Sequence, residues 1–478
     1  MMKDASTENL EPSVKHSKSV YASNSIFQFT VSFMSTAQTV FLFFYYEAVL
    51  GLNYYLIFAA MVIFTVWDAI NDPLIGFLTD RNFKWTRRWG RRFPWIVIGI
   101  APWCLSLYLI FSAPNIDARV NPWPVFWWLV LSLVLLDTFG TLVGVNITAL
   151  RPDKFRSEDE RRVLSGYFGL FDMIALSMGM LIPPLFLGLG TGRESYAIMG
   201  GMVAFIALIS AVLCLPGSRE EKLVIDRYYS TEYERMSFLK GLKEAIFNKP
   251  FVVFMIALTA FNIATTIMTS NVVYLTTFVL RASPDTITLI FAIFLTGALI
   301  SIPFWLWYLK KIKNNKKVLT VGGFVMCAAL VPMTFFQTLI DLLIIVFILG
   351  VSMGSMWIYF YTVILANVAD DYVVKTKKNQ KAILIGATFL VSRLGATMDE
   401  LLISLVHDLT GFIPGYDTYE ALAAVVANME PVLWGIRFLT GVIPALILLI
   451  GTLIFWKFYP LTQDLVIKNK AELEKLGF

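Results

Sequence analysis

The sequence is poor in charged residues. Asp, Glu, Lys and Arg make up only 15% of the 478 residues, whereas apolar types make up 57% and the mean hydropathy is +0.69. Soluble domains carry about 25% charged residues. A water-soluble protein of this length is therefore excluded, and lipid must surround much of its surface.

Histidine and cysteine are also scarce. The two histidines, His16 and His407, are too few for a histidine metal site. The three cysteines lie inside apolar runs without metal-ligand spacing, so we expect neither a structural metal nor disulfide chemistry. The polar N-terminal segment has no apolar stretch of the kind found in a cleavable signal peptide, and we interpret it as a short disordered tail.

Long apolar runs dominate what remains. A membrane-spanning helix needs about 20 mostly apolar residues, and twelve such runs occur, at 26–50, 53–79, 94–113, 125–150, 163–189, 197–215, 251–280, 286–309, 318–337, 342–368, 382–407 and 432–457. This pattern predicts an all-α membrane protein of twelve helices in two six-helix halves. The predicted divisions are a tail at 1–24, bundles at 25–215 and 251–458, a central loop at 216–250 and a C-terminal tail at 459–478.

Basic residues are distributed unequally between alternate loops. The loops at 80–93, 310–317 and 369–381 are rich in Lys and Arg, whereas the long 408–431 loop has none. The positive-inside rule therefore predicts that both termini and the central loop are cytoplasmic. The basic loops after the second and eighth helices occupy equivalent places in the two halves, which is typical of a duplicated six-helix unit.

Acidic residues inside the second apolar run are the strongest functional signal. An ionised side chain at the bilayer centre costs about 2.5–3.5 kcal/mol on insertion scales. Asp68 and Asp72 are spaced i, i+4 and share one helix face, with Asn71 close to it. Pro73 removes the amide that would bond the Ala69 carbonyl. Two carboxylates, an amide and a freed carbonyl form an oxygen set that suits Na⁺, and the carboxylates could bind H⁺ instead. The alternative is a purely structural role, in which these groups hold neighbouring helices together through hydrogen bonds.

Other intramembrane polar groups have less certain roles. Asp137 in the fourth run and Arg393 in the eleventh could bind substrate or pair with each other across the halves. Trp357 could stack on a sugar face or serve in packing. For the remaining charged residues, mutual charge balance is as adequate an explanation as a function in transport. These residues are Asp172, Asp399, Glu400 and Arg437.

Several motifs carry a resemblance to a known family. They are WDAINDPLIGFLTD (67–80), RRWGRRFPW (87–95), NITALRPDKFRSEDERR (146–162), ANVADDYVVKTKKNQKA (366–382) and SRLGA (392–396). Together they resemble the glycoside–pentoside–hexuronide:cation symporters of the major facilitator superfamily. The resemblance spans both halves at the expected spacing, and the motif of the second helix is specific.

The resemblance implies roles for individual residues. Asp68, Asn71 and Asp72 match the cation site, and Asp137 matches an acid that binds sugar hydroxyls. Arg393 falls where the family usually has a lysine. The cytoplasmic loop motif, whose charges help to close the inner gate, is matched by Gly76, Asp80, Arg81, Gly90 and Arg91.

The sequence also departs from the family pattern. The stretch 29–33 lacks an acid found midway along the first helix of some members, and Phe168 and Gly169 stand where sugar transporters often have an arginine. Val134 and Asn367 replace a threonine and an aspartate. The coupling residues thus match better than the sugar site. Animal lysolipid symporters share the motif of the second helix, so an amphiphilic substrate remains an alternative.

The function predicted is symport of a sugar or glycoside with Na⁺ or H⁺ by alternating access. The alternative outside the transporters is an integral membrane enzyme. However, the diphosphate-binding motif of membrane prenyltransferases is incomplete after Asn71-Asp72, and G-x-S-x-G, H-E-x-x-H and P-loop motifs are absent. We therefore expect no enzyme activity, no cofactor and no nucleic-acid partner, and a monomer in the plasma membrane.

Overall fold

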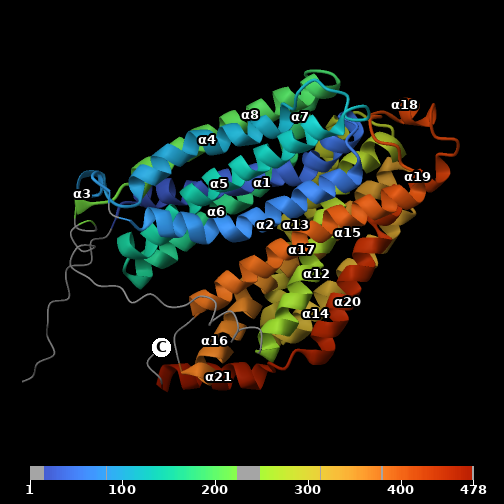
Figure 1. Ribbon diagram of the computed structural model, residues 1–478. Coiled ribbons are helices and arrows are strands. Elements are labelled where there is room, and N and C mark those ends of the chain that lie inside the picture. Colours follow the sequence, from blue (N-terminus) through green and yellow to red (C-terminus); the bar gives the residue numbers. More distant parts are fainter. Residues whose placement is uncertain are drawn as a thin grey trace, which may run out of the picture.

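The computed structural model describes residues 16–81, 83–222, 225, 248–312, 314–377 and 381–475 (Figure 1). These residues form helices joined by short loops, and no strand occurs among them. The predicted all-helical class is therefore confirmed.

The N-terminal half contains six long helices and several short ones. In chain order its elements are α1 (Lys18–Phe44) with the π-helical turn η1 (Tyr45–Val49), α2 (Tyr54–Thr79), α3 (Thr86–Trp89), α4 (Phe93–Phe111), α5 (Pro122–Lys154), α6 (Glu158–Leu181), α7 (Pro183–Leu187), α8 (Gly192–Leu213) and α9 (Leu215–Ser218).

The C-terminal half repeats this plan. Its elements are α12 (Lys249–Tyr274) with η2 (Leu275–Val279), α13 (Asp285–Ile312), α14 (Asn315–Leu330) with η3 (Val331–Thr334), α15 (Leu339–Ile358), η4 (Tyr359–Ile364), α16 (Leu365–Thr376), α17 (Lys381–Thr410), α18 (Tyr419–Ala423), α19 (Glu430–Thr440), α20 (Val442–Phe458) and α21 (Gln463–Lys475).

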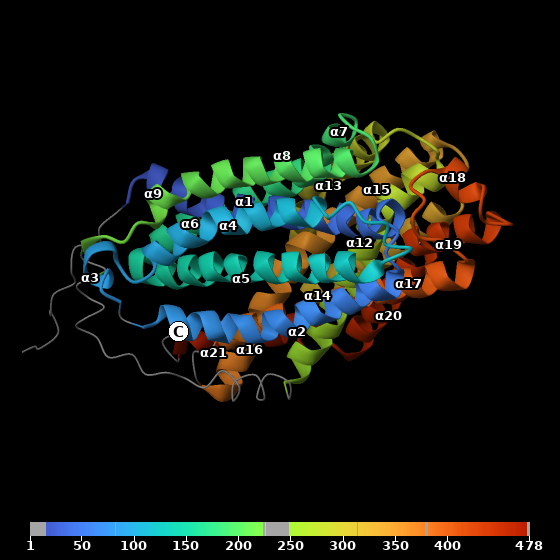
Figure 2. The same cartoon turned by 45° about the horizontal axis from the view of Figure 1, so that its top comes forward.

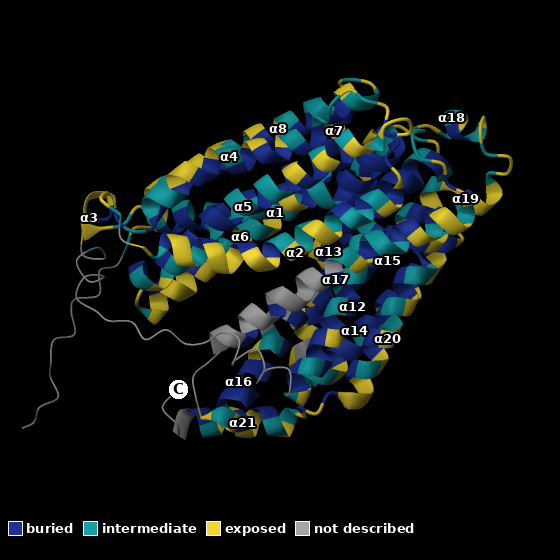
Figure 3. Cartoon of the chain, in the orientation of Figure 1, coloured by how far each residue is buried: buried dark blue, intermediate teal, exposed yellow. Residues whose placement is uncertain are grey.

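The long helices match the apolar runs of the sequence. Within the described residues, 11 helical segments are long and apolar enough to cross a membrane. The 30-residue helix α17 lies at the predicted place of the remaining span and carries the charged side chains of that run. Exposed apolar side chains such as Val97 and Ile98 on α4 and Phe205 and Ile209 on α8 cover outward faces, as helices in lipid require (Figure 3).

Two helices differ locally from their apolar runs. The tenth continues through η4 and α16 to Thr376, beyond the predicted end at residue 368. The twelfth is interrupted at Gly441, where a Cβ atom would lie 2.2 Å from the Thr334 hydroxyl oxygen. Hydropathy alone cannot reveal either feature, because both depend on neighbouring helices.

The two halves meet at one end of the molecule and separate at the other (Figure 1), and Figure 2 shows α7 and α18 at the end opposite to α3. We call the end that carries α7 and α18 the outer end and the end that carries α3 and α21 the inner end. At the outer end the halves are joined by hydrogen bonds from Tyr54 to Asp408 and from Ser404 to the Tyr54 carbonyl. The basic segment around α3 lies at the inner end (Figure 1), as does α16, which makes the predicted loop at 369–381 helical as far as Thr376.

Candidate functional site

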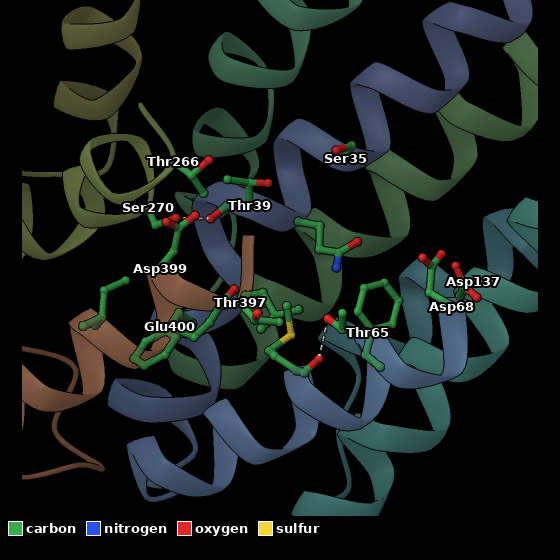
Figure 4. Close-up of a pocket in the computed structure, with 16 residues that line it drawn as sticks. Ser35, Thr39, Thr65, Asp68, Asp137, Thr266, Ser270, Thr397, Asp399 and Glu400 are labelled. Carbon is green, nitrogen blue, oxygen red and sulfur yellow. Dashed lines mark hydrogen bonds between the residues drawn. The ribbon is translucent and has the colours of Figure 1, made fainter. Parts of the chain in front are cut away.

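A cavity of about 310 Å³ lies between the halves. Helices α1, α2 and α5 of the N-terminal half and α12 and α17 of the C-terminal half line it. Its acidic side chains form two groups at opposite ends: Asp68 and Asp137 from the N-terminal half, and Asp399 and Glu400 from the C-terminal half (Figure 4). Hydroxyl groups line the space between them, including those of Thr39, Thr65 and Thr266.

The predicted cation residues lie where α2 packs against α5. Asp68 is 3% exposed and Asn71 is fully buried. The Asn71 amide donates a hydrogen bond to Asp137 Oδ2 over 2.9 Å, and its own oxygen has no hydrogen-bond partner among the described residues. The structure thus brings Asn71, predicted for the cation site, into contact with Asp137, predicted for substrate binding, and both roles stay predictions.

Asp72 lies one turn further toward the inner end. Its carboxylate accepts a hydrogen bond from the Thr141 hydroxyl of α5 over 2.8 Å, and the residue is exposed, unlike Asp68. Among the described residues, no group of three or more His, Cys, Asp or Glu side chains is close enough to hold a metal ion. In this conformation the two aspartates thus face α5 at different depths, without forming a closed ligand shell.

The structure does not test the other predicted substrate residues, but it shows what Arg437 contacts. The side chains of Trp357 and Arg393 lie outside the described residues, so the pairing of Arg393 with Asp137 stays a prediction. Arg437 donates to the carbonyls of Thr334 and Phe336 over 3.1 and 2.7 Å. It therefore binds a helix end and does not balance the acids of the cavity.

Sequence analysis missed the acidic end formed by α17. Asp399 is 1% exposed, and both of its carboxylate oxygens lack a hydrogen-bond partner in the described part of the chain. One carboxylate oxygen of Glu400, Oε2, is also buried without a hydrogen-bond partner among the described residues. The signal was present as adjacent acids in an apolar run, but charge balance had been judged an adequate explanation.

A second missed group joins the halves at the outer end. Glu47 of η1 is fully buried and accepts a hydrogen bond from the Tyr274 hydroxyl of α12. Its other oxygen lies 2.9 Å from Nδ1 of His407 in α17, which is 1% exposed. The sequence contained both titratable residues, but their separation of 360 positions hid the contact.

The predicted inner-gate residues lie in the last turn of α2, where Gly76 is, and in the loop between α2 and α4. Asp80 pairs more closely with Arg92, at 2.7 Å, than with Arg91, at 3.9 Å. Gly90 has a positive φ of +90°, and a Cβ atom there would meet the Glu220 carboxylate at 2.4 Å. Thus Gly90, Asp80 and Arg91 share one cluster, to which the sequence analysis had not assigned Arg92 or Glu220.

The remaining loop residues lie apart from that cluster. The Arg81 guanidinium lies over the Phe77 ring, 4.7 Å from its centroid, and a Cβ atom at Gly76 would meet nothing within 4 Å. Burial lowers the pKa of the Arg92 guanidinium, while the negative charges of Asp80 and Glu220 act in the opposite direction. The cluster is a compact, charge-balanced support for the start of α4.

Comparison with known proteins agrees with this architecture. The family described as MFS/sugar transport protein matches residues 23–463. The sodium-dependent lysophosphatidylcholine symporter 1 of Xenopus tropicalis is 23% identical over 458 residues, covering 87% of this chain and 82% of that protein. A sphingosine-1-phosphate transporter of the same organism is 23% identical over 433 residues, covering 83% of this chain and 79% of that protein.

A solved structure supports the fold. The crystal structure of a bacterial homologue of the human lysosomal transporter Spinster, in an inward-facing and unoccupied conformation, aligns with a TM-score of 0.62 at 13% identity. The alignment covers 95% of this chain and 96% of that one. With the helices, the cavity and the family match together, this chain belongs to the MFS/sugar transport protein family and is a membrane transporter of the major facilitator superfamily.

Proposed function

We propose that the protein is a Na⁺-coupled symporter of a sugar or glycoside. The observation that carries the proposal is the polar site between α2 and α5, where Asn71 bonds Asp137 and Asp72 bonds Thr141 inside the membrane. Intramembrane acids are costly and are functional by default. Both helices belong to the same half, so the site can move as a unit during the transport cycle.

The donor set favours Na⁺ as the coupling ion. Asp68, Asp72 and Asp137 offer carboxylates, and Thr141 offers a hydroxyl. Asn71 offers an amide oxygen that has no hydrogen-bond partner among the described residues. Hard cations bind such oxygen ligands. The relatives named sodium-dependent symporters support the same choice. Among the described residues no three His, Cys, Asp or Glu side chains lie close enough together to hold a metal ion, so the amide and hydroxyl oxygens would have to supply part of the Na⁺ shell.

The lining of the cavity favours an uncharged polyhydroxylated solute. Carboxylates lie at both ends and hydroxyl groups lie between them, all of which can accept hydrogen bonds from sugar hydroxyls. No Lys or Arg occurs among the described residues of the lining. A phosphate group would meet the carboxylates of Asp68 and Asp137 with like-charge repulsion. The family description as sugar transport proteins supports this choice.

A lysolipid is the second candidate. It is favoured by relatives named as lysophosphatidylcholine and sphingosine-1-phosphate transporters, which align with more than four-fifths of the chain. The cavity also has apolar lining residues that could contact an acyl chain: Leu42, Phe43, Met61, Phe64 and Ile403. Such a substrate would need its phosphate to be bound by a cation outside the described lining.

Transport would proceed by rocking of the two halves. In this conformation bonds close the outer end, whereas the inner ends diverge (Figure 1). Reversal of this arrangement would open the cavity outward. Na⁺ bound near Asp68 and Asp72 would reduce repulsion among the acids and favour solute binding, and linkage requires the effect to be reciprocal. We further propose a plasma-membrane monomer with cytoplasmic termini, because the basic loops lie at the inner end.

Uptake into proteoliposomes tests the proposal. A labelled panel of glycosides, pentoses, hexuronides and lysolipids would be offered with a Na⁺ gradient, a proton gradient or neither. We expect a sugar to accumulate with the Na⁺ gradient and Na⁺ to raise its affinity by roughly 5–150-fold. Asp72→Asn should abolish both effects, whereas the exposed control Glu430→Gln should retain them. Accumulation of lysolipids alone would overturn the sugar assignment. Gradient-independent equilibration of every compound would overturn symport.

A further inference from the structure

The acidic end of the cavity on α17 is not explained by the Na⁺ site. Asp399 is almost completely buried, yet neither of its carboxylate oxygens has a hydrogen-bond partner among the described residues. Figure 4 shows Asp399 directed toward Ser270 and Thr39, on the opposite side of the cavity from Asp68 and Asp137. Its carboxyl group is therefore buried with at most a weak contact to the Thr266 hydroxyl, and it faces the transport cavity.

The surrounding helices do not supply a described counter-charge. Helix α12 contributes the hydroxyls of Thr266 and Ser270 to this part of the cavity, and Ser270 already donates to the Thr39 carbonyl over 2.8 Å. Across the cavity, α2 and α5 present the acids Asp68 and Asp137. Toward the outer end of α1 and α17, Glu47 and His407 bond each other. On α17 itself, the neighbour is Glu400, and the side chain of Arg393 lies outside the described residues.

An ionised carboxylate is expensive in this position. The effective penalty for burying an ion without a partner is several kcal/mol even after relaxation, and a neighbouring acid adds repulsion. Binding of one proton removes the charge and gives the group a hydrogen to donate. Na⁺ fits less well than at the α2–α5 site, since the Ser270 hydroxyl is already engaged.

We propose that Asp399 is a proton-binding site, separate from the Na⁺ site, and that each transport cycle carries a proton as well as Na⁺. The coupling part of this statement rests on the proposed function, whereas proton binding at Asp399 does not. Each half then contributes one cation site, at opposite ends of the solute cavity. When the outer end opens, α17 separates from α1 and α2, and Asp399 gains access to the outer solution.

Infrared spectroscopy of the full-length protein in liposomes tests proton binding without any solute. The probe is the C=O stretch of a protonated carboxylic acid at neutral pH, with its shift in deuterated water. We expect the difference spectrum between wild type and Asp399→Asn to contain one such band, with and without Na⁺. Asp172→Asn is the matched control, since Asp172 already accepts hydrogen bonds from Gln28 and Ser32. That variant should retain the band.

Two infrared results would overturn the site. One is an unchanged carboxylic-acid band in Asp399→Asn, which would mean that Asp399 is ionised. The other is loss of the Asp399 band when Na⁺ is added, which would mean that the site takes Na⁺. Asp399→Glu should restore a shifted band, and retained ²²Na⁺ binding by Asp399→Asn would show that the variant is folded.

Transport thermodynamics tests the coupling. With the solute identified by the uptake panel, a tenfold proton gradient added to a fixed Na⁺ gradient should raise the wild-type accumulation ratio about tenfold, as one co-transported proton requires. Asp399→Asn should lose this increment, because the equilibrium accumulation ratio depends on how many ions are coupled and not on how tightly the solute binds. If the accumulation ratio of the wild-type protein does not change with the proton gradient, proton coupling is wrong. If neither a Na⁺ gradient nor a proton gradient drives accumulation of any solute, the proposed function is wrong. The infrared test of proton binding at Asp399 does not depend on that result.

Discussion

The outer and inner ends of the molecule use polar groups in different ways. At the outer end, Glu47 bonds Tyr274 and His407, and its backbone carbonyl accepts the Gly415 amide, so one residue of the N-terminal half holds three elements of the C-terminal half. At the inner end, the bonds of Asp80 to Arg92 remain within the N-terminal half.

The C-terminal half shows the same inner pattern. Asp371 of α16 pairs with Lys375 over 2.6 Å and accepts a hydrogen bond from Asn469 of α21. These partners belong to one half, as do those of the Asp80 cluster. The comparison suggests that bonds at the outer end control which conformation is populated, whereas bonds at the inner end hold the shape of each half.

The largest effect is expected from Glu47→Ala. The substitution leaves the Tyr274 hydroxyl and the His407 ring without their buried partner, and each unsatisfied group costs about 1–3 kcal/mol. A total loss of about 3 kcal/mol would shift the equilibrium toward the outward-open state by roughly 100-fold. Labelling of a Thr39→Cys reporter in the cavity by an impermeant maleimide from the outer side would measure this shift.

The control for this experiment is Glu420→Ala. Glu420 is exposed on α18 at the same end, so its removal should leave the labelling rate unchanged. Equal labelling in Glu47→Ala and wild type would show that the buried contact does not hold the outer end closed.

A smaller effect at the same end is expected from Asp408→Asn. Asp408 accepts hydrogen bonds from the hydroxyls of Tyr54 and Tyr55 over 2.6 and 2.8 Å, but it is exposed. Exposed charged contacts are worth about 0.2–1 kcal/mol, so labelling of the same reporter should rise at most about 5-fold. A larger rise than in Glu47→Ala would reverse the proposed ranking of buried and exposed contacts.

The sequence predicted the helices well because lipid imposes a simple rule. A segment that crosses a bilayer must be long and apolar, and each backbone group must bond within its own helix. The acids of α2 were predicted as a site for the same reason, since charge in an apolar run is costly. The break at Gly441 was not predicted, because it depends on Thr334 of another helix.

Contacts between distant segments could not be derived from the sequence. His407 was considered only as a metal ligand, and its pairing with Glu47 depends on how α17 packs against the end of the first membrane helix. The same holds for Asp80, whose closer partner is Arg92 because of how the loop turns into α4. Local patterns identify which residues are unusual, and packing decides what they face.

The smallest effect on the conformational equilibrium is expected from Glu220→Gln at the inner end. The Glu220 carboxylate accepts the backbone amides of Arg91, Arg92 and Phe93, which are the unsatisfied donors at the start of α4. Loss of its charge should reduce the free energy of unfolding by about 0.5–2 kcal/mol, as expected for a weakened helix cap.

Two measurements separate the stabilising role of Glu220 from gating. Thermal unfolding in detergent should occur at a lower temperature in Glu220→Gln than in wild type or in the exposed control Glu420→Gln. Outer labelling of the Thr39→Cys reporter should stay at the wild-type rate, because Glu220 and its three amide partners move together within one half. If labelling changes as much as in Asp408→Asn, the inner cluster also governs the contact between halves, and the distinction between the two ends fails.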